Sequence, residues 1–398
     1  MAEGKPDRGT PGEVFGAFLK LGLTSFGGPI AHLGYFRDEL VTRRAWLSDQ
    51  AYADLVALCQ FLPGPASSQT GFALGLMRAG WAGALAAFVA FTLPSAAIML
   101  AFALTAGSLS GPIGAGVMHG LRLVAVAIVA QAVWGMARSL CPDRERAGIA
   151  AGAVAILAFA PGGAGMALAI ALGALAGSAL RSGSAEAAGL HVAVPVSRRQ
   201  GMLALVIFLG LLAILPVAGA GWHPLAVFDS FYRAGSLVFG GGHVVLPLLE
   251  AGVVGPGWVS PDRFLAGYGA AQAVPGPLFT FAAYLGAVLD PGPGGFAGAV
   301  LALAALFLPG FLILIAALPF WDGMRAMPAA RSAMAGANAA VVGILGAALY
   351  APVFVGSVGN MRDFALALIC LVALLAWRAS PWLVVVLGAL GGAALAVI

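Results

Sequence analysis

Two short stretches combine helix-breaking residues with hydrogen-bond donors. "QFLPGPASSQTG" begins at Gln60 and "QAVPGPLFTFAAYLG" begins at Gln272, and both lie within apolar sequence. Proline is favourable in the first turn of a helix because its missing N–H is not needed there. Each Pro-Gly-Pro therefore predicts a break followed by a new helix, beginning at Ala66 and at Leu278. Helix N-termini present unpaired N–H groups and a partial positive charge, which suit an anion.

The side chains around the two breaks add donors unequally. Hydroxyl and amide groups follow the first break, whereas only one hydroxyl follows the second. Gln60 and Gln272 are interpreted as paired buried amides, whose partners are either the broken backbone or a bound substrate. The candidate anion-binding residues of these stretches are Gln60, Pro63, Gly64, Pro65, Ser67, Ser68 and Gln69, and Gln272, Pro275, Gly276, Pro277 and Thr280.

A second pair of signals is the glycine runs in "SFGGPIAH" and "FGGGHVV". Glycine permits unwinding or close approach of a backbone, and close helix packing is the alternative reading. Each run has a nearby histidine, which either contacts substrate or couples protons, or is a hydrogen-bonded structural residue. The candidates are Gly27, Gly28, Pro29 and His32, and Gly240, Gly241, Gly242 and His243.

Three basic residues lie within apolar segments, where a charge is costly and usually lines a pathway. Lys20 and Arg233 occupy equivalent positions in two matching stretches of the sequence, and Arg122 aligns with Asn338. They are expected to face an anion, with snorkelling to the interface as the alternative. Asp54 is either a proton-coupling acid or a salt-bridge partner. This interpretation predicts that Lys20→Ala or Arg233→Ala abolishes transport. Together the signals indicate a site for a small, multiply charged anion.

Composition places these residues in a membrane. The chain of 398 residues is 61% hydrophobic and 9% charged, against about 25% charged in soluble domains. Apolar runs near the length of a membrane-spanning helix recur, which predicts an all-α polytopic membrane protein surrounded by membrane lipid. The three cysteines have no metal or redox spacing, so neither metal nor cofactor is expected. The net charge of +4 does not indicate nucleic acid, because basic residues usually mark cytoplasmic loops.

The sequence contains an internal repeat. "FLKLGLTSFGGP" returns as "FYRAGSLVFGGG", and "WLS" returns as "WVS", at offsets between 212 and 215 residues. The prediction is a polar N-terminal segment 1–12, a first repeat 13–182, a linker 183–225 with an extra helix 201–220, and a second repeat 226–398. Six segments per repeat and one linker helix make thirteen, which predicts inverted-topology repeats with discontinuous helices. The short fifth and sixth segments of each repeat are either spans or hairpins that do not cross.

The distribution of basic residues predicts which ends of the segments face the cytoplasm. With the N-terminus in the cytoplasm, thirteen of them, Arg378 included, fall inside and four outside, as the positive-inside rule expects. Three of those outside lie in "YFRDELVTRRAW", Tyr35–Trp46, which could instead be an amphipathic helix in the interface. The side of this segment therefore stays open.

"FLKLGLTSFGGPIAH", "WLSDQAYADLVALCQFLPGPASSQ", "LVFGGGHVVLPLLE" and "AQAVPGPLFTFAAYLGA" resemble the chromate ion transporter (CHR) family in its long two-domain form. The resemblance implies a transporter of the bacterial cytoplasmic (inner) membrane that exports chromate, driven by the membrane gradient and not by ATP. It implies that the glycine runs, their histidines and the Pro-Gly-Pro residues are the functional ones.

Alternatives remain at this point. Sulfate is isosteric with chromate, so a sulfate transporter is one, and a channel-like anion pathway is another. An enzyme is not expected, because acidic residues within the apolar segments are few and scattered. A homodimer stays open, since no dimer face is evident in the sequence.

Overall fold

The computed structural model describes residues 9–106, 111–180, 195–239, 242–321 and 327–397. Every regular element among them is a helix, which confirms the all-α prediction. Six helices are long and apolar enough to cross a membrane. They are α4 (Ala66–Ala106), α5 (Gly111–Leu140), α7 (Gly163–Leu180), α8 (Arg198–Gly219), α13 (Gly295–Ala317) and α15 (Pro328–Ala348).

The remaining helices are shorter. In the first half they are α1 (Pro11–Thr24), α2 (Gly28–Phe36), the π-helix η1 (Arg37–Arg43), α3 (Asp49–Phe61) and α6 (Arg144–Phe159). In the second half they are α9 (His223–Ser236), η2 (Gly242–Val244), α10 (Val245–Leu249), η3 (Glu250–Val254), α11 (Pro261–Ala271), η4 (Leu278–Thr280), α12 (Phe281–Val288), η5 (Leu318–Phe320), η6 (Leu349–Phe354), α16 (Val355–Ser357), α17 (Met361–Leu375) and α18 (Pro381–Leu395).

The helix breaks lie where Pro-Gly-Pro predicts them. α3 ends at Phe61 and α4 begins at Ala66, while α11 ends at Ala271 and η4 begins at Leu278. The first glycine run also interrupts a helix, because Gly27 takes a left-handed φ of 96° between α1 and α2. The prediction of discontinuous helices is therefore confirmed in the described residues.

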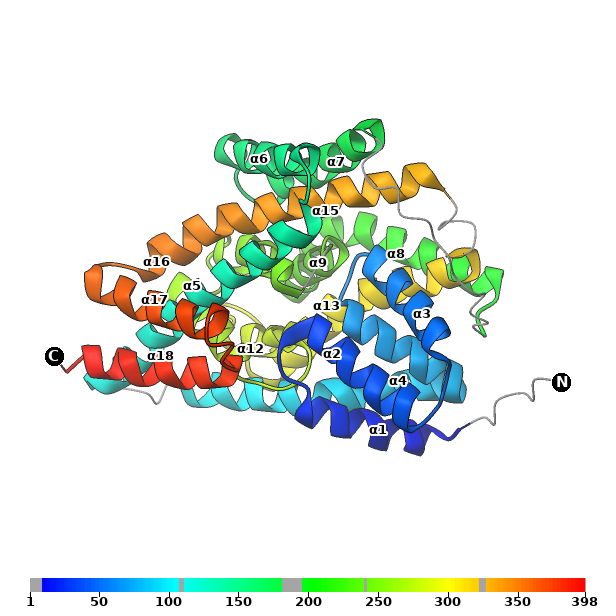
Figure 1. The fold of residues 1–398 in the computed structure, drawn as a ribbon, viewed down its shortest axis with the longest axis horizontal. Helices are drawn as coiled ribbons and strands as arrows, with labels where there is room; N and C mark the ends of the chain where they lie inside the picture. Colours follow the sequence, from blue (N-terminus) through cyan, green and yellow to red (C-terminus); the bar gives the residue numbers. More distant parts are fainter. Residues whose placement is uncertain (1–8, 107–110, 181–194, 240–241, 322–326, 398) are drawn as a thin grey trace.

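The segment from Tyr35 to Trp46 returns to the end of the molecule where α1 begins. Trp46 Nε1 donates to Glu13 Oε1 at 3.0 Å, and Arg78 Nη2 donates to the same oxygen at 3.1 Å. α1 and α2 therefore form a hairpin whose turn points into the protein. The count of thirteen spans assumed that residues 13–33 cross to the far end, and the fold corrects this. Figure 1 shows α1, α2, α3 and the start of α4 at one end, with α17 and α18 at the other.

This hairpin makes a labelling prediction. Thr42 and Gly12 are both exposed at the same end of the molecule. In a background without native cysteines, Thr42→Cys and Gly12→Cys should react with a membrane-impermeant maleimide from the same side of the membrane. Labelling from opposite sides would support a span over residues 13–33 and contradict the hairpin.

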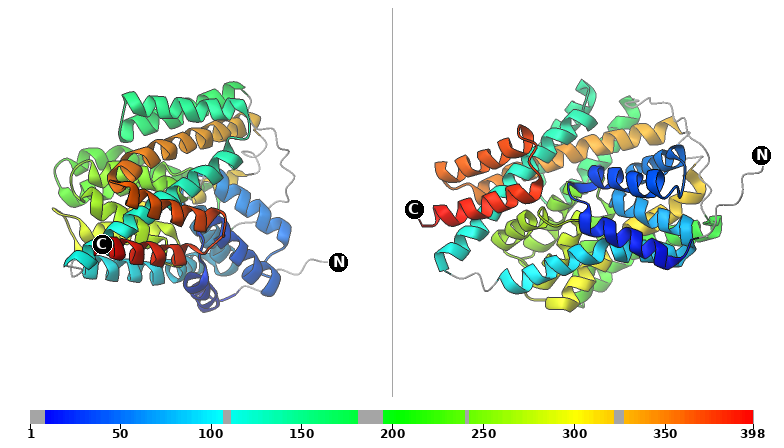
Figure 2. Two further views of the ribbon diagram at one scale, coloured as in Figure 1. Left: turned by 60° about the vertical axis from the view of Figure 1, so that its left-hand side comes forward. Right: turned by 60° about the horizontal axis from the view of Figure 1, so that its bottom comes forward.

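The two halves interlock through small residues. The α6–α7 hairpin of the first half packs on α15 of the second (Figures 1 and 2), and α18 of the second half packs on α5 of the first. A Cβ added at Gly120 would overlap the Gly388 carbonyl, and one at Gly336 would overlap the Gly173 carbonyl. Such close approach is how small residues stabilise helix pairs in membranes. The reciprocal exchange joins the halves into one body.

Candidate functional site

A cavity of about 330 Å³ lies where the two halves meet. The first half contributes the glycine run at the start of α2 and two residues of α5, and the second contributes the break before η4 and the turn between α17 and α18. The lining residues are Gly27, Gly28, Ile128, Gln131, His243, Ala271, Gln272, Val274, Gly276, Leu278, Leu374, Arg378, Ala379 and Pro381.

Hydrogen bonds cross between the halves next to this cavity. The N–H of Gly276 donates to the Ser25 carbonyl at 2.8 Å, and the N–H of Gly64 donates to the Val238 carbonyl at 2.7 Å. Ser25 and Val238 occupy matching positions in the repeat, as do Gly64 and Gly276. Each of the two contacts is therefore the repeat counterpart of the other. The break in each half is therefore held by the chain of the other.

The cavity presents several hydrogen-bond donors. α2 begins at the cavity with no side-chain cap, so its first N–H groups have no partner within the helix. Gln272 lines the cavity, and its side-chain amide interacts with the Tyr268 hydroxyl. His243 Nδ1 lies 2.7 Å from the Tyr268 hydroxyl, which leaves Nε2 as the second ring nitrogen. A positive helix end and amide groups together suit an anion.

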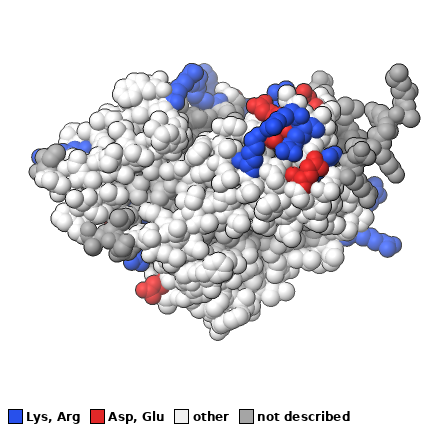
Figure 3. All heavy atoms as spheres, turned by 90° about the horizontal axis from the view of Figure 1, so that it is seen from below, with Lys and Arg blue, Asp and Glu red and all other residues white. Residues whose placement is uncertain are grey.

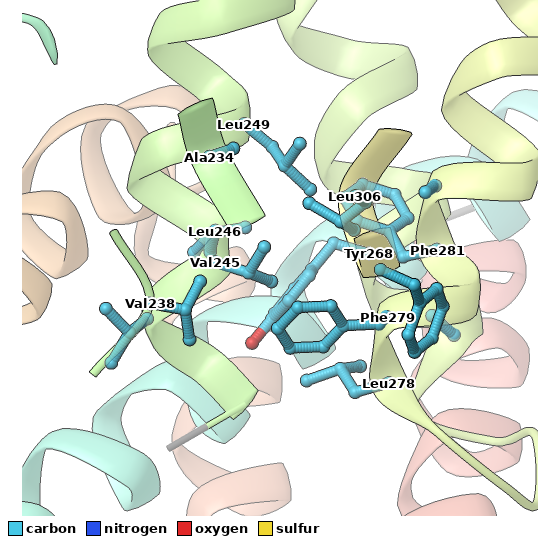
Figure 4. Close-up of a cluster of buried hydrophobic side chains, with 14 of the residues drawn as sticks. Ala234, Val238, Val245, Leu246, Leu249, Tyr268, Leu278, Phe279, Phe281 and Leu306 are labelled. Carbon is cyan, nitrogen blue, oxygen red and sulfur yellow. The ribbon is translucent and has the colours of Figure 1, made fainter. Parts of the chain in front are cut away.

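An apolar wall backs the second-half break. Figure 4 shows Tyr268 among Phe279, Phe281 and Leu306, with Leu278 beside them. Tyr268 is fully buried, and its hydroxyl has His243 as a partner. A buried tyrosine hydroxyl needs such a partner. The aromatic cluster therefore fixes the position of His243 at the cavity.

The donors after the first break lie behind the cavity. Gln69 Nε2 donates to the Pro63 carbonyl at 2.9 Å and to the Gly310 carbonyl at 2.8 Å. Ser67 Oγ lies 3.4 Å from Nδ1 of the buried His32. These contacts satisfy backbone and side-chain groups that the break would otherwise leave unpaired. The first break is only partly satisfied in this way, because Ser68 Oγ, Gln69 Oε1 and His32 Nε2 are buried without a hydrogen-bond partner among the described residues.

Most of the other predicted residues also lie outside the cavity lining. Ser68 is buried, and Thr280 is buried with its hydroxyl donating to the Pro277 carbonyl at 2.7 Å. Gln60 is exposed on α3, which corrects its interpretation as a buried amide. The predicted residues that do not line the cavity include Pro29, Pro63, Gly64, Pro65, Gly242, Pro275 and Pro277. Gly240 and Gly241 lie outside the described residues.

The three predicted cations already have acidic partners. Lys20 Nζ lies 2.6 Å from Glu39 Oε2, and Arg233 Nε lies 2.8 Å from Asp229 Oδ1. Arg122 pairs with Asp262. None of the three lines the cavity. Each of the three is therefore already paired with a carboxylate of the protein, although Lys20 shares Glu39 with two arginines.

Glu39 is the centre of a small ionic cluster. Besides Lys20, it accepts from Arg44 at 2.8 Å and from Arg43 at 3.1 Å. Burial alone raises the pKa of the Glu39 carboxyl, but hydrogen bonds from Lys20 and Arg44 outweigh this and lower the pKa to about 2. Figure 3 shows one patch of mixed basic and acidic side chains, with further charged groups scattered near the edges of a mainly uncharged face.

Asp54 is buried on α3 with 7% exposure, and its Oδ2 has no hydrogen-bond partner among the described residues. No ion pair to an arginine is present for it in the described residues, and it does not line the cavity. Its predicted part in proton coupling stays a prediction.

Two polar lining residues were not singled out by the sequence. Gln131 lies in the middle of an apolar helix, and Arg378 was counted among loop arginines. The available signal was the shortness of the segments before and after Arg378, which sequence analysis had left open as a hairpin that does not cross the membrane.

Comparison with known proteins gives consistent matches. A family model described as "Chromate transporter" matches residues 12–178 and 225–393. The "Chromate transport protein" of Pseudomonas aeruginosa is 29% identical over 348 residues, covering 84% of this chain and 79% of that protein. A "Probable chromate transport protein" of Synechococcus elongatus is 28% identical over 390 residues, covering 94% and 93%.

The "Chromate transport protein" of Cupriavidus metallidurans is 28% identical over 338 residues, covering 82% of this chain and 79% of that protein. No solved structure matches the fold.

Proposed function

The chain belongs to the chromate transporter family, and we propose that it is a secondary transporter that exports chromate from the cytoplasm. The observation that carries this proposal is the cavity between the halves, bounded by a helix N-terminus and by amide and imidazole groups. Relatives named as chromate transport proteins cover most of the chain, which supports the choice of anion.

The proposed site holds one tetrahedral dianion. The first N–H groups of α2 face its oxygens, and the Gln272 amide in the cavity wall supplies a further donor. Gln131 and His243 complete the polar lining. Because these groups come from both halves, a relative movement of the halves changes access to the anion, as in transporters built from repeats.

The membrane potential is a sufficient driving force for the proposed export. Moving one charge across 100 mV is worth about 2.3 kcal/mol. A dianion leaving a negative interior gains roughly twice that per 100 mV. Proton coupling through His32, His243 or Asp54 is therefore an addition that the energetics do not require.

The direct test is radiolabelled chromate flux in proteoliposomes, with membrane potential and pH gradient set independently and unlabelled sulfate as competitor. The expected result is saturable flux driven by potential alone. Flux that needs a pH gradient would move the driving force to protons. Sulfate flux without chromate flux would overturn the proposed substrate, and flux that never saturates would favour a channel.

Lys20→Gln should leave this flux intact, contrary to the expectation from sequence. Arg43 and Arg44 still neutralise Glu39 in the variant, and Lys20 lies outside the cavity lining. Since the Lys20 side chain is 49% exposed, losing its ion pair should cost at most about 1 kcal/mol of stability. Flux in proteoliposomes and thermal unfolding in detergent check the two statements. A well-folded variant without flux would restore Lys20 to the anion path.

A further inference from the structure

We propose that Arg378 is the cation that binds the transported dianion. This inference rests on the proposed function and names the charged ligand of the same site. Arg378 lies in the turn between α17 and α18 and lines the cavity together with Gln131, Gln272 and the first glycines of α2. No acidic residue is among the lining residues.

The turn that carries Arg378 lies within the membrane. α17 and α18 have 15 residues each, which corresponds to about 22 Å at 1.5 Å per residue. The hydrocarbon core is about 30 Å thick, so neither helix crosses it. α17 begins at a polar end, with Asn360 as its cap and Arg362 and Asp363 in its first turn. The opposite end of the hairpin, with Arg378, therefore lies at depth, where a charge marks a functional site.

Arg378 has no hydrogen bond or ion pair within the part of the chain that the structure describes. Lys20, Arg122 and Arg233 all have carboxylate partners, whereas none is present for Arg378. Its side chain is exposed at the cavity, so no other part of the described protein covers it. An unpaired guanidinium in a cavity without acids leaves its positive charge available to an anion.

The backbone at Arg378 is also unusual. Its φ is 51°, a left-handed conformation that costs a residue with a Cβ roughly 1–2 kcal/mol. The turn is closed by the Ala379 N–H, which donates to the Ala373 carbonyl at 2.9 Å. In the corresponding α6–α7 turn of the first half, glycine takes the left-handed position, at Gly162. Strained residues of this kind cluster at ligand sites. Here the residue with the left-handed backbone is Arg378, whose side chain is positively charged.

The chemistry of the guanidinium fits the proposed ligand. Arginine presents its N–H groups in a planar fork that can bind two oxygens of one oxyanion. The α2 N-terminus adds a partial positive charge from the opposite half. A dianion in the cavity is thus held between a full charge from the second half and a helix end from the first.

Binding to the purified full chain tests this proposal separately from transport. Equilibrium binding of radiolabelled chromate, and of radiolabelled sulfate, would be measured for the wild type, Arg378→Asn, Arg378→Lys and Arg362→Gln. Asparagine tolerates the left-handed region, so Arg378→Asn removes the charge without adding backbone strain. Arg362, exposed at the other end of the same helix, is the matched control. Monodispersity and thermal unfolding show that each variant is folded.

We expect Arg378→Asn to weaken binding about tenfold to hundredfold, the usual worth of a hydrogen bond to a charged group. Arg378→Lys should bind better than Arg378→Asn, and Arg362→Gln should bind as the wild type does. If a folded Arg378→Asn binds chromate normally, Arg378 is not the ligand, while the proposed function stands. If the wild type binds sulfate alone and Arg378→Asn loses it, Arg378 is supported and chromate is overturned. If the wild type binds neither anion, both proposals fail.

Discussion

Replacing Gly336 by leucine is expected to destabilise the folded protein strongly. A Cβ at this position of α15 would overlap the carbonyl oxygen of Gly173 and lie 2.8 Å from the Cα of Gly177. Both obstacles are backbone of α7, so no side chain can turn away to make room. The helices have to separate along a contact that joins the two halves. Overpacking costs about 1–3 kcal/mol, occasionally more, and this site belongs to the severe end because backbone itself is displaced.

The control for this prediction lies on the same helix. A Cβ at Gly346 would meet no atom within 4 Å, so Gly346→Leu should fold and unfold close to the wild type. Thermal unfolding of the detergent-purified proteins and their yield from membranes measure both variants. Equal stability of Gly336→Leu and Gly346→Leu would mean that α7 and α15 do not approach as closely as described.

The local events of the fold could be predicted from sequence, because their causes are local. Pro-Gly-Pro breaks a helix, so the new starts at Ala66 and Leu278 follow from three residues each. The glycine run before α2 breaks a helix for a similar reason, since Gly27 takes a conformation that a residue with a Cβ avoids.

Tertiary partners could not be predicted in the same way. Gln69 was expected to face an anion, yet one of its acceptors is the carbonyl of Gly310, 241 residues away. Lys20 was interpreted as a buried cation, and its partner Glu39 lies on a segment that the span count had placed at the opposite end. Hydropathy gives the length of an apolar segment and not whether the segment turns back. The roles expected for Gln69 and Lys20 were wrong because the sequence does not say which distant segments meet in the folded protein.

Arg378 was missed for a related reason. A charged residue between two apolar segments normally marks a membrane surface, so sequence reasoning assigned it to a cytoplasmic loop. The structure places the turn at the cavity, because α17 and α18 are short and α18 packs on α5. Depth in the membrane is a property of the assembled helices, and the charge pattern alone reports only the commoner arrangement.

Gly28→Phe is expected to reduce chromate flux to background while the protein stays folded. Gly28 lines the cavity, and a Cβ added there would meet no heavy atom within 4 Å. The ring would therefore enter open space and fill the proposed anion site beside the α2 N-terminus. Its φ of 81° also imposes the left-handed cost, roughly 1–2 kcal/mol, so lost flux has to be separated from lost stability.

Gly257→Phe is the control that separates loss of flux from loss of stability. Its φ is 79° and its Cβ position is equally open, but it lies in the turn after η3 and does not line the cavity. Gly257→Phe should therefore lose about as much thermal stability as Gly28→Phe and keep its flux in proteoliposomes. Gly28→Asn, which tolerates the left-handed region and is smaller, should keep part of the flux. Equal loss of flux at both positions would attribute the effect to backbone strain, and full flux in Gly28→Phe would place the anion path elsewhere. The pair thus distinguishes occupancy of the cavity from damage to the fold.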